Sequence, residues 1–215
     1  MIAAADALLR GRGEFAVDAA RVPLRALGLL ALVFGFAYGA GMGAYSGRAA
    51  QAVYSGLKVP LLLGLSTLVC LPSFFVVNTI LGLRDDFAAA LRAVLCSQAT
   101  VAVALGALLP ITGLAYVSSA NYRFAVLFNG VQFALAALAG QRTLGRHYRP
   151  LVARHQAHAH ARRLWLALYI FVAIQLAWVL RPFVGAPGLR STFLREDAWS
   201  NAYVVVLRDV LGFGG

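Results

Sequence analysis

The sequence has little charge and very few acidic residues. Charged residues make up 13 % of its 215 residues, about half the share that is usual in soluble domains. Lys58 is the only lysine among the 19 basic residues, and no aspartate or glutamate occurs between Asp86 and Glu196. Hydrophobic residues reach 61 %, and a soluble chain of this size has too small an interior for so many apolar side chains. The composition excludes a soluble globular enzyme, a disordered chain and a disulfide scaffold, and it predicts an integral membrane protein.

The residues that catalysis or metal binding would need are also scarce. The apolar runs contain no carboxylate or histidine, which proton-coupled transporters and pumps generally require inside the membrane. All four histidines lie in the segment 142–163, with no cysteine or acid nearby to complete a tetrahedral metal site. Cys70 and Cys96 both lie within apolar runs, which favours packing roles. We therefore expect no enzyme activity, no cofactor and no metal site.

Five apolar runs are long enough to cross a bilayer, which takes about 20 residues per helix. They cover approximately residues 24–45, 59–83, 87–116, 122–141 and 164–180. Pro72 and Pro110 lie inside two of these runs and predict local kinks. The sequence thus predicts one all-α transmembrane domain over residues 1–215, a bundle of about five helices with amphipathic N- and C-terminal segments.

The C-terminal residues 182–215 are expected to form an external tail. Apolar and aromatic side chains recur in it at the spacing of one helical face, and the stretch is too short to span a bilayer. Such a helix is typical of the membrane interface or of docking against a partner. The residues of this face are Trp199, Tyr203, Val206, Val210 and Phe213.

The distribution of basic residues predicts the orientation. With five spans, one side holds four arginines at the N-terminus, two near the second loop and six in the fourth, which makes 12. The other side holds seven basic residues. Because cytoplasmic loops carry the excess of arginine and lysine, we expect a cytoplasmic N-terminus and an external C-terminus. Arginine in place of lysine indicates a high-GC bacterial genome and hence the inner membrane, and the charge is attributed to topology rather than to nucleic-acid binding.

Two further patterns indicate how the spans pack. Gly35, Gly39 and Gly43 fall on one face of the first span, where they would let another backbone approach closely. The partner of this face is either the second span or a second subunit. Polar side chains inside the runs are either interhelical hydrogen-bonding groups or the lining of a solute pathway. They are Ser66, Ser73, Asn78, Gln98, Thr100, Asn129, Gln132 and Gln175.

Two short motifs carry a family resemblance. The segment from Trp178 to Pro187 has the pattern W-x-x-R-P-F-x-G-x-P, and the second run contains Leu71-Pro72-Ser73 followed by Asn78. In these features the chain resembles uncharacterised bacterial multi-pass membrane proteins. The resemblance covers most of the chain and implies no known activity.

Three functional hypotheses follow from these patterns. The first is a non-enzymatic structural or accessory subunit, a scaffold or anchor of a membrane complex, with the lipid bilayer and other membrane subunits or a second copy as partners. The alternative is an oligomeric channel or carrier for anions or small neutral solutes. An enzyme acting on lipid ranks last, because it would depend on Asp85, Asp86 and the basic loop alone.

Overall fold

A computed structural model describes residues 1–19, 22–185, 191–194, 201, 203 and 204, and every regular element in this part of the chain is helical. Five of the helices are long and apolar enough to cross a membrane, which confirms the predicted all-α membrane bundle. The elements are α1 (Ile2–Arg10), η1 (Gly13–Phe15), α2 (Leu24–Gly43), η2 (Ala44–Ser46), α3 (Ala49–Ile80), α4 (Phe87–Ser118), α5 (Tyr122–Arg154) and α6 (Ala157–Val179).

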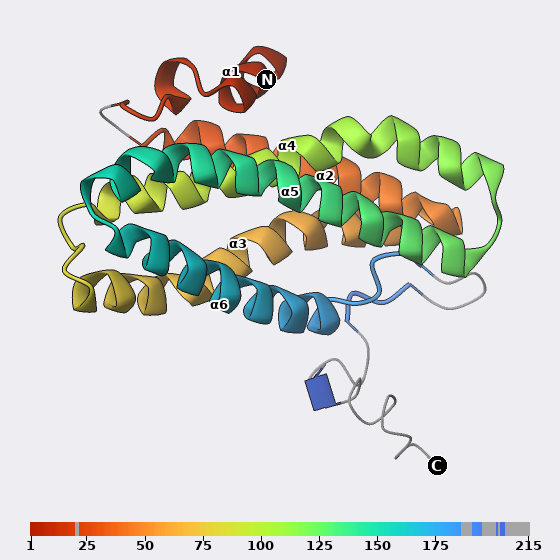
Figure 1. Ribbon diagram of the computed structural model, residues 1–215. Coiled ribbons are helices and arrows are strands. Elements are labelled where there is room, and N and C mark those ends of the chain that lie inside the picture. The colour runs from red at the N-terminus through yellow and green to blue at the C-terminus, as the bar shows by residue number, and fades with distance from the viewer. Residues whose placement is uncertain (20–21, 186–190, 195–200, 202, 205–215) are drawn as a thin grey trace.

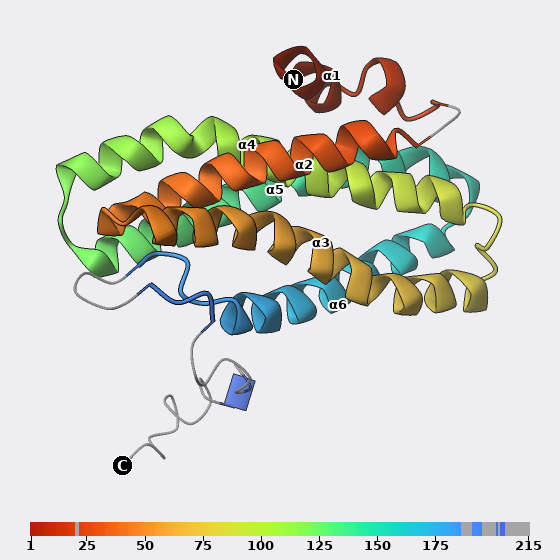
Figure 2. The same ribbon diagram turned by 180° about the vertical axis from the view of Figure 1, so that it is seen from behind.

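The five long helices form a ring that is not closed. Helix α2 packs between α3 and α4, α5 packs on the far side of α4, and α6 packs on the far side of α3. The spatial order is therefore α6–α3–α2–α4–α5, and α5 and α6 form its two edges (Figures 1 and 2). These two edges have few contacts with each other, although one short turn joins them in the sequence.

The two ends of the ring differ in charge. One end carries the α3–α4 and α5–α6 turns together with the start of α2, and we call it the arginine-rich end (Figure 1). The α3–α4 turn is a Schellman motif, in which Gly82 adopts φ 71° and Leu83 N donates to Asn78 O. The other end, which we call the opposite end, carries the α2–α3 and α4–α5 turns and the end of α6.

Helices α3, α5 and α6 extend beyond the apolar runs that the sequence shows. Helix α3 begins ten residues before the expected start at residue 59, and α5 continues from residue 141 to Arg154 in spite of Pro150. Hydropathy marks only the part of a helix that lies in lipid, whereas packing decides where the helix ends. In α5, Leu144, Tyr148 and Leu151 belong to a buried cluster with Trp165 of α6, and this tertiary contact stabilises the polar extension.

The amphipathic N-terminal segment lies outside the ring, across α2 and α4 (Figure 2). Its buried side chains Ala5, Leu8 and Phe15 join a cluster of residues from those two helices. Arg146 Nη2 of α5 donates to Leu9 O at 3.0 Å and Arg92 Nη1 of α4 donates to Val17 O at 3.3 Å. The buried Arg92 of α4 and the half-buried Arg146 of α5 thus hold the main chain of this segment against the bundle.

On the surface of α1, Arg10 Nε donates to Asp6 Oδ1 at 2.7 Å. This hydrogen bond and the negative charge of the carboxylate raise the pKa of Arg10 above its ordinary value. Both side chains are more than half exposed, so the pair contributes little to stability.

Only part of the predicted C-terminal face can be located. Trp199, Val206, Val210 and Phe213 lie outside the described residues. The ring of Tyr203 stacks on Phe171 of α6, with 4.6 Å between centroids, and its hydroxyl donates to Phe171 O at 2.7 Å. This contact places Tyr203 beside α6.

Candidate functional site

The glycine face of α2 packs against α3 of the same chain. A Cβ atom on Gly39 would lie 2.9 Å from Gly56 Cα, and one on Gly43 would lie 2.8 Å from Ala52 Cα. Gly35 faces Pro60 at an ordinary contact distance of 3.5 Å. In this structure the glycine face therefore contacts α3 of the same chain.

Asn129 is the centre of a buried polar network inside the ring. Its Oδ1 accepts a hydrogen bond from Tyr38 at 2.8 Å, and its Nδ2 donates to Tyr116 Oη at 2.6 Å and to Ala125 O at 2.7 Å. Asn129 is 3 % exposed. The network joins α2, α4 and α5, and it uses both N–H donors of the amide and one acceptor site of its oxygen.

A second set of polar contacts joins α4 to its neighbours. Thr100 Oγ1 lies 3.2 Å from Thr143 Oγ1 of α5, and it donates to Cys96 O at 2.8 Å. Ser97, which sequence analysis did not single out, donates to Gly140 O at 2.9 Å. Gln98 Oε1 accepts from Tyr169 of α6 at 2.9 Å. These groups connect helices within one chain.

The remaining polar residues of the spans do not form one stripe. Ser66 and Asn78 are buried, and Asn78 Nδ2 donates to Phe74 O of its own helix. Gln132 is buried in α5 and Gln175 is half-buried in α6. Ser73, expected on the same face of α3 as Ser66, is exposed.

The exposure of Ser73 has a geometric reason. The buried positions of this part of α3 follow a four-residue step, as Ser66, Cys70, Phe74 and Asn78 show. A row of this kind turns slowly around the helix and is the ridge that packs when helices cross at an angle. Ser73 lies seven residues from Ser66 and therefore falls outside the row.

A buried polar cluster at the opposite end involves Lys58, which sequence analysis used only as a marker of topology. Lys58 is 0 % exposed, and its Nζ donates to Pro182 O at 2.7 Å. Gln51 and Ser55 donate to Phe183 O from the same face of α3. A single lysine next to an apolar run was the only signal that the sequence offered for this cluster.

The segment held by this cluster closes one end of the ring. After α6 the chain crosses towards α5, where Tyr122 Oη donates to Val184 O at 3.2 Å. Residues 182–184 are therefore hydrogen-bonded to α3 and to α5 at the same time. The segment therefore bridges α3, α5 and the end of α6.

At the arginine-rich end, Asp86 joins the two turns. Its Oδ2 lies 3.0 Å from His158 Nε2, and its Oδ1 lies 3.5 Å from Arg154 Nη1. His158 is fully buried, whereas Arg154 is largely exposed. In the part of the chain that the structure describes, no three histidine, cysteine, aspartate or glutamate side chains gather as a metal site would require.

A large cavity follows the open edge of the ring, and we call it the lateral cleft. It has a volume of about 800 Å³ and is lined by residues 126–141 of α5, residues 165–177 of α6 and shorter parts of α3 and α4. Its lining is mainly apolar, with Gln98, Tyr169 and Asn129 among the polar groups. Several lining residues, such as Val126, Ile170 and Ile174, are more than 40 % exposed, so the cleft opens sideways between α5 and α6.

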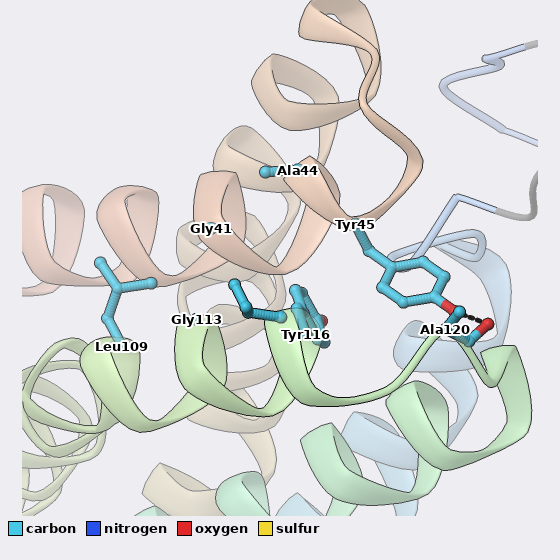
Figure 3. Close-up of a pocket in the computed structure, with 8 residues that line it drawn as sticks. Gly41, Ala44, Tyr45, Leu109, Gly113, Tyr116 and Ala120 are labelled. Carbon is cyan, nitrogen blue, oxygen red and sulfur yellow. Dashed lines mark hydrogen bonds between the residues drawn. The ribbon is translucent and has the colours of Figure 1, made fainter.

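A second cavity lies on the other face of the bundle, near the opposite end, and we call it the α2–α4 notch (Figure 3). It has a volume of about 590 Å³. Four small residues, Gly41, Ala44, Gly113 and Ala120, line it together with Tyr45 and other apolar side chains. Tyr45 Oη donates to Ala120 O at 2.7 Å and forms one wall.

The geometry thus offers internal polar networks, a lateral cleft and a surface notch, all within the described residues. Comparison with known proteins adds no relative to this description. No family model, no curated protein and no solved structure matches the chain.

Proposed function

We propose that the protein is a non-enzymatic structural or accessory subunit of a membrane complex. The observation that carries this proposal is the α2–α4 notch, which is lined by small residues on the surface of two long apolar helices. Small residues let a neighbouring helix approach closely, and close packing drives helix association in lipid. The expected partner is a transmembrane helix that places a large apolar side chain in the notch.

The free space around Gly113 supports the proposal that the notch binds a partner helix. A Cβ atom at Gly113 would meet nothing within 4 Å in the chain itself, so the glycine is not required by any contact inside the bundle. Gly39, in contrast, is required by the α2–α3 contact. A glycine in a helix without an internal reason costs about 1 kcal/mol relative to alanine, which an external contact would offset.

The internal hydrogen bonds favour a subunit over a channel. Asn129, Thr100 and Gln98 each bond a neighbouring helix, as interhelical groups do. Polar groups that are satisfied in this way stabilise one fixed arrangement. The channel or carrier alternative would need such groups to face a continuous pathway.

The orientation of this subunit follows from the positive-inside rule. The arginine-rich end is proposed to face the bacterial cytoplasm, with the N-terminus, and the C-terminus would lie outside. Arg92 and Arg146 lie near this end, and both bond the N-terminal segment. Fusion of a reporter that is active on only one side of the membrane to either terminus tests this orientation.

The test of the subunit function is a matched pair of variants. The full-length tagged chain is extracted from its native membrane in mild detergent, and the bound chains are identified by native mass analysis. Gly113→Leu fills the notch, whereas Gly64→Leu adds the same side chain at another open position, on α3. We expect stoichiometric partner chains with the wild type and with Gly64→Leu, and their loss with Gly113→Leu.

Two other outcomes would contradict the proposal. A monomer without partner chains would leave the subunit function without support. A pure homo-oligomer that raises solute flux in liposomes would favour the channel alternative, and substitutions of Asn129 and Gln132 would then be tested for flux.

A further inference from the structure

The lateral cleft is long and mainly apolar. Along α5 its lining extends from Val126 to Gln141, which corresponds to about 22 Å at 1.5 Å per residue. The cavity has a volume of about 800 Å³ over this length. It thus offers an elongated apolar space between α5 and α6.

The closed ends of the cleft restrict how a ligand can enter. At the arginine-rich end, the α5–α6 turn and the buried cluster around Tyr148 and Trp165 fill the space between the edges. At the opposite end, Pro182, Phe183 and Val184 close it. The remaining opening lies between α5 and α6, at the level of their apolar spans. A ligand that enters there comes from the hydrocarbon core of the bilayer.

Charge is confined to one end of the cleft. Arg181 is the only charged residue among those that line it in the described part of the chain. The Arg181 guanidinium lies 3.3 Å from the centroid of the Trp178 ring, so the aromatic face orients it. Its position just after α6 corresponds to the level of lipid headgroups. A positive charge at this level attracts an anionic lipid headgroup.

We propose that the lateral cleft binds one hydrocarbon chain of an anionic phospholipid, with the phosphate at Arg181 and the end of the chain near Trp165. The apolar lining buries the chain, and the opening between α5 and α6 admits it from the bilayer. Within the cleft, the Tyr169 hydroxyl and the Gln98 amide oxygen are hydrogen-bonded to each other, so these two atoms are not left unpaired against an apolar ligand. This proposal does not rest on the subunit function, because it concerns another face of the bundle.

Trp165 provides a direct probe of occupancy. It is 3 % exposed, so lipids around the outside of the bundle do not reach its ring, yet it lines the cleft. The full-length chain with Trp199→Phe, which keeps Trp178 next to Arg181, would be reconstituted in phosphatidylcholine vesicles that contain phosphatidylglycerol with a brominated chain. The same chain with Trp165→Phe as well would be measured beside it, and the difference between the two emissions reports Trp165. Bromine quenches tryptophan fluorescence on contact. We expect Trp165 to be quenched, and more strongly when the bromine is near the methyl end of the chain than near its ester.

Two variants of α6 separate the cleft from the outer surface. Ala173→Phe places a ring in the cleft, and Ala167→Phe places the same ring at an exposed position of the same helix that does not line the cleft. Quenching of Trp165 is expected to disappear with the first variant and to persist with the second.

The headgroup is tested by charge at Arg181. In the wild type, half-maximal quenching of Trp165 should need a mole fraction of brominated phosphatidylglycerol about tenfold lower than that of brominated phosphatidylcholine. A difference of this size is typical of one charge-assisted contact. Arg181→Gln should remove this preference, and Arg181→Lys should restore most of it. Equal quenching by the two lipids in the wild type would overturn the anionic assignment.

Two further results would overturn the lipid site as a whole. One is the absence of quenching in the wild type, or quenching that Ala173→Phe leaves unchanged. The other is a co-purifying polypeptide that is lost with Ala173→Phe, since this would identify a protein segment as the occupant. The Gly113→Leu and Gly64→Leu pair tests the α2–α4 notch separately, so failure of one proposal is distinguishable from failure of the other.

Discussion

The contact between α2 and α3 and the gap between α5 and α6 use similar residues with opposite results. At the α2–α3 contact, Gly39 and Gly43 bring two backbones together. At the gap, small residues such as Gly130, Ala134 and Ala173 face each other across the lateral cleft. The two pairs also differ in what connects them, because residues 182–184 bridge the end of α6 to α3 and α5 through hydrogen bonds. Small side chains permit close packing, but they do not by themselves enforce it.

The largest effect is expected from a substitution that disrupts the close contact between α2 and α3. Gly39→Leu would place a side chain against the backbone of Ser55 and Gly56, where no rotamer change relieves the clash. We expect a loss of at least about 3 kcal/mol in the free energy of unfolding, the upper range for overpacking. The measurement is the yield of monodisperse protein after extraction, together with its thermal unfolding. Gly28→Leu in the same helix, where a Cβ atom meets nothing within 4 Å, should behave as the wild type.

The next effect concerns residues 182–184, which close the opposite end of the lateral cleft. Lys58→Met removes the donor to Pro182 O from a fully buried site. A charge-assisted hydrogen bond of this kind contributes about 1.5–3 kcal/mol. We expect faster hydrogen exchange at residues 182–185 and unchanged exchange in α2. Unchanged exchange at residues 182–185 would mean that Gln51 and Ser55 are sufficient to hold the segment.

A smaller effect is expected inside the ring. Asn129→Leu removes the hydrogen bonds to Tyr38 and Tyr116, and hydrogen bonds between membrane helices average about 0.6 kcal/mol each. A loss of about 1–2 kcal/mol is therefore expected in the free energy of unfolding. Tyr38→Phe should cost less alone and should add little to Asn129→Leu, which a double-mutant cycle would measure. Fully additive effects would contradict a shared network.

Much of the fold could be predicted from the sequence, because hydropathy and length respond directly to the bilayer. The all-α class and the five spans belong to this part. The order of the helices in the ring could not be predicted, since it depends on side-chain contacts between distant segments. Ser73 shows the limit clearly, because its position on the helix was known but the crossing angle of α3 was not.

The candidate site was less predictable than the fold. The pattern located Asn129 and Gln98, but both a bonded network and a pathway use the same residue types. Lys58 and Ser97 gave no distinctive signal, since a buried lysine bonded to a carbonyl differs from an interfacial lysine only in tertiary structure. The two cavities left no pattern in the sequence, because they arise where helices fail to meet.

The smallest effect concerns the turn that holds α5 and α6 together at the arginine-rich end. Asp86→Asn keeps the size of the side chain but removes its charge, and so weakens the pairing with His158 and Arg154. Arg154 is largely exposed, so its ion pair with Asp86 contributes little to the free energy of unfolding. Most of the effect comes from the contact with the buried His158. We expect a loss of about 0.5–1 kcal/mol in the free energy of unfolding.

The same substitution sharpens the comparison between the two edges of the ring. If Asp86 limits how far α5 and α6 separate at this end, the lateral cleft should widen in Asp86→Asn, and Trp165 should be quenched by lipid of either headgroup. Arg154→Gln is the matched control, because it removes only the exposed partner. Unchanged selectivity in Asp86→Asn would show that the packing of Tyr148, Leu151 and Trp165 alone sets the spacing of the two helices at this end.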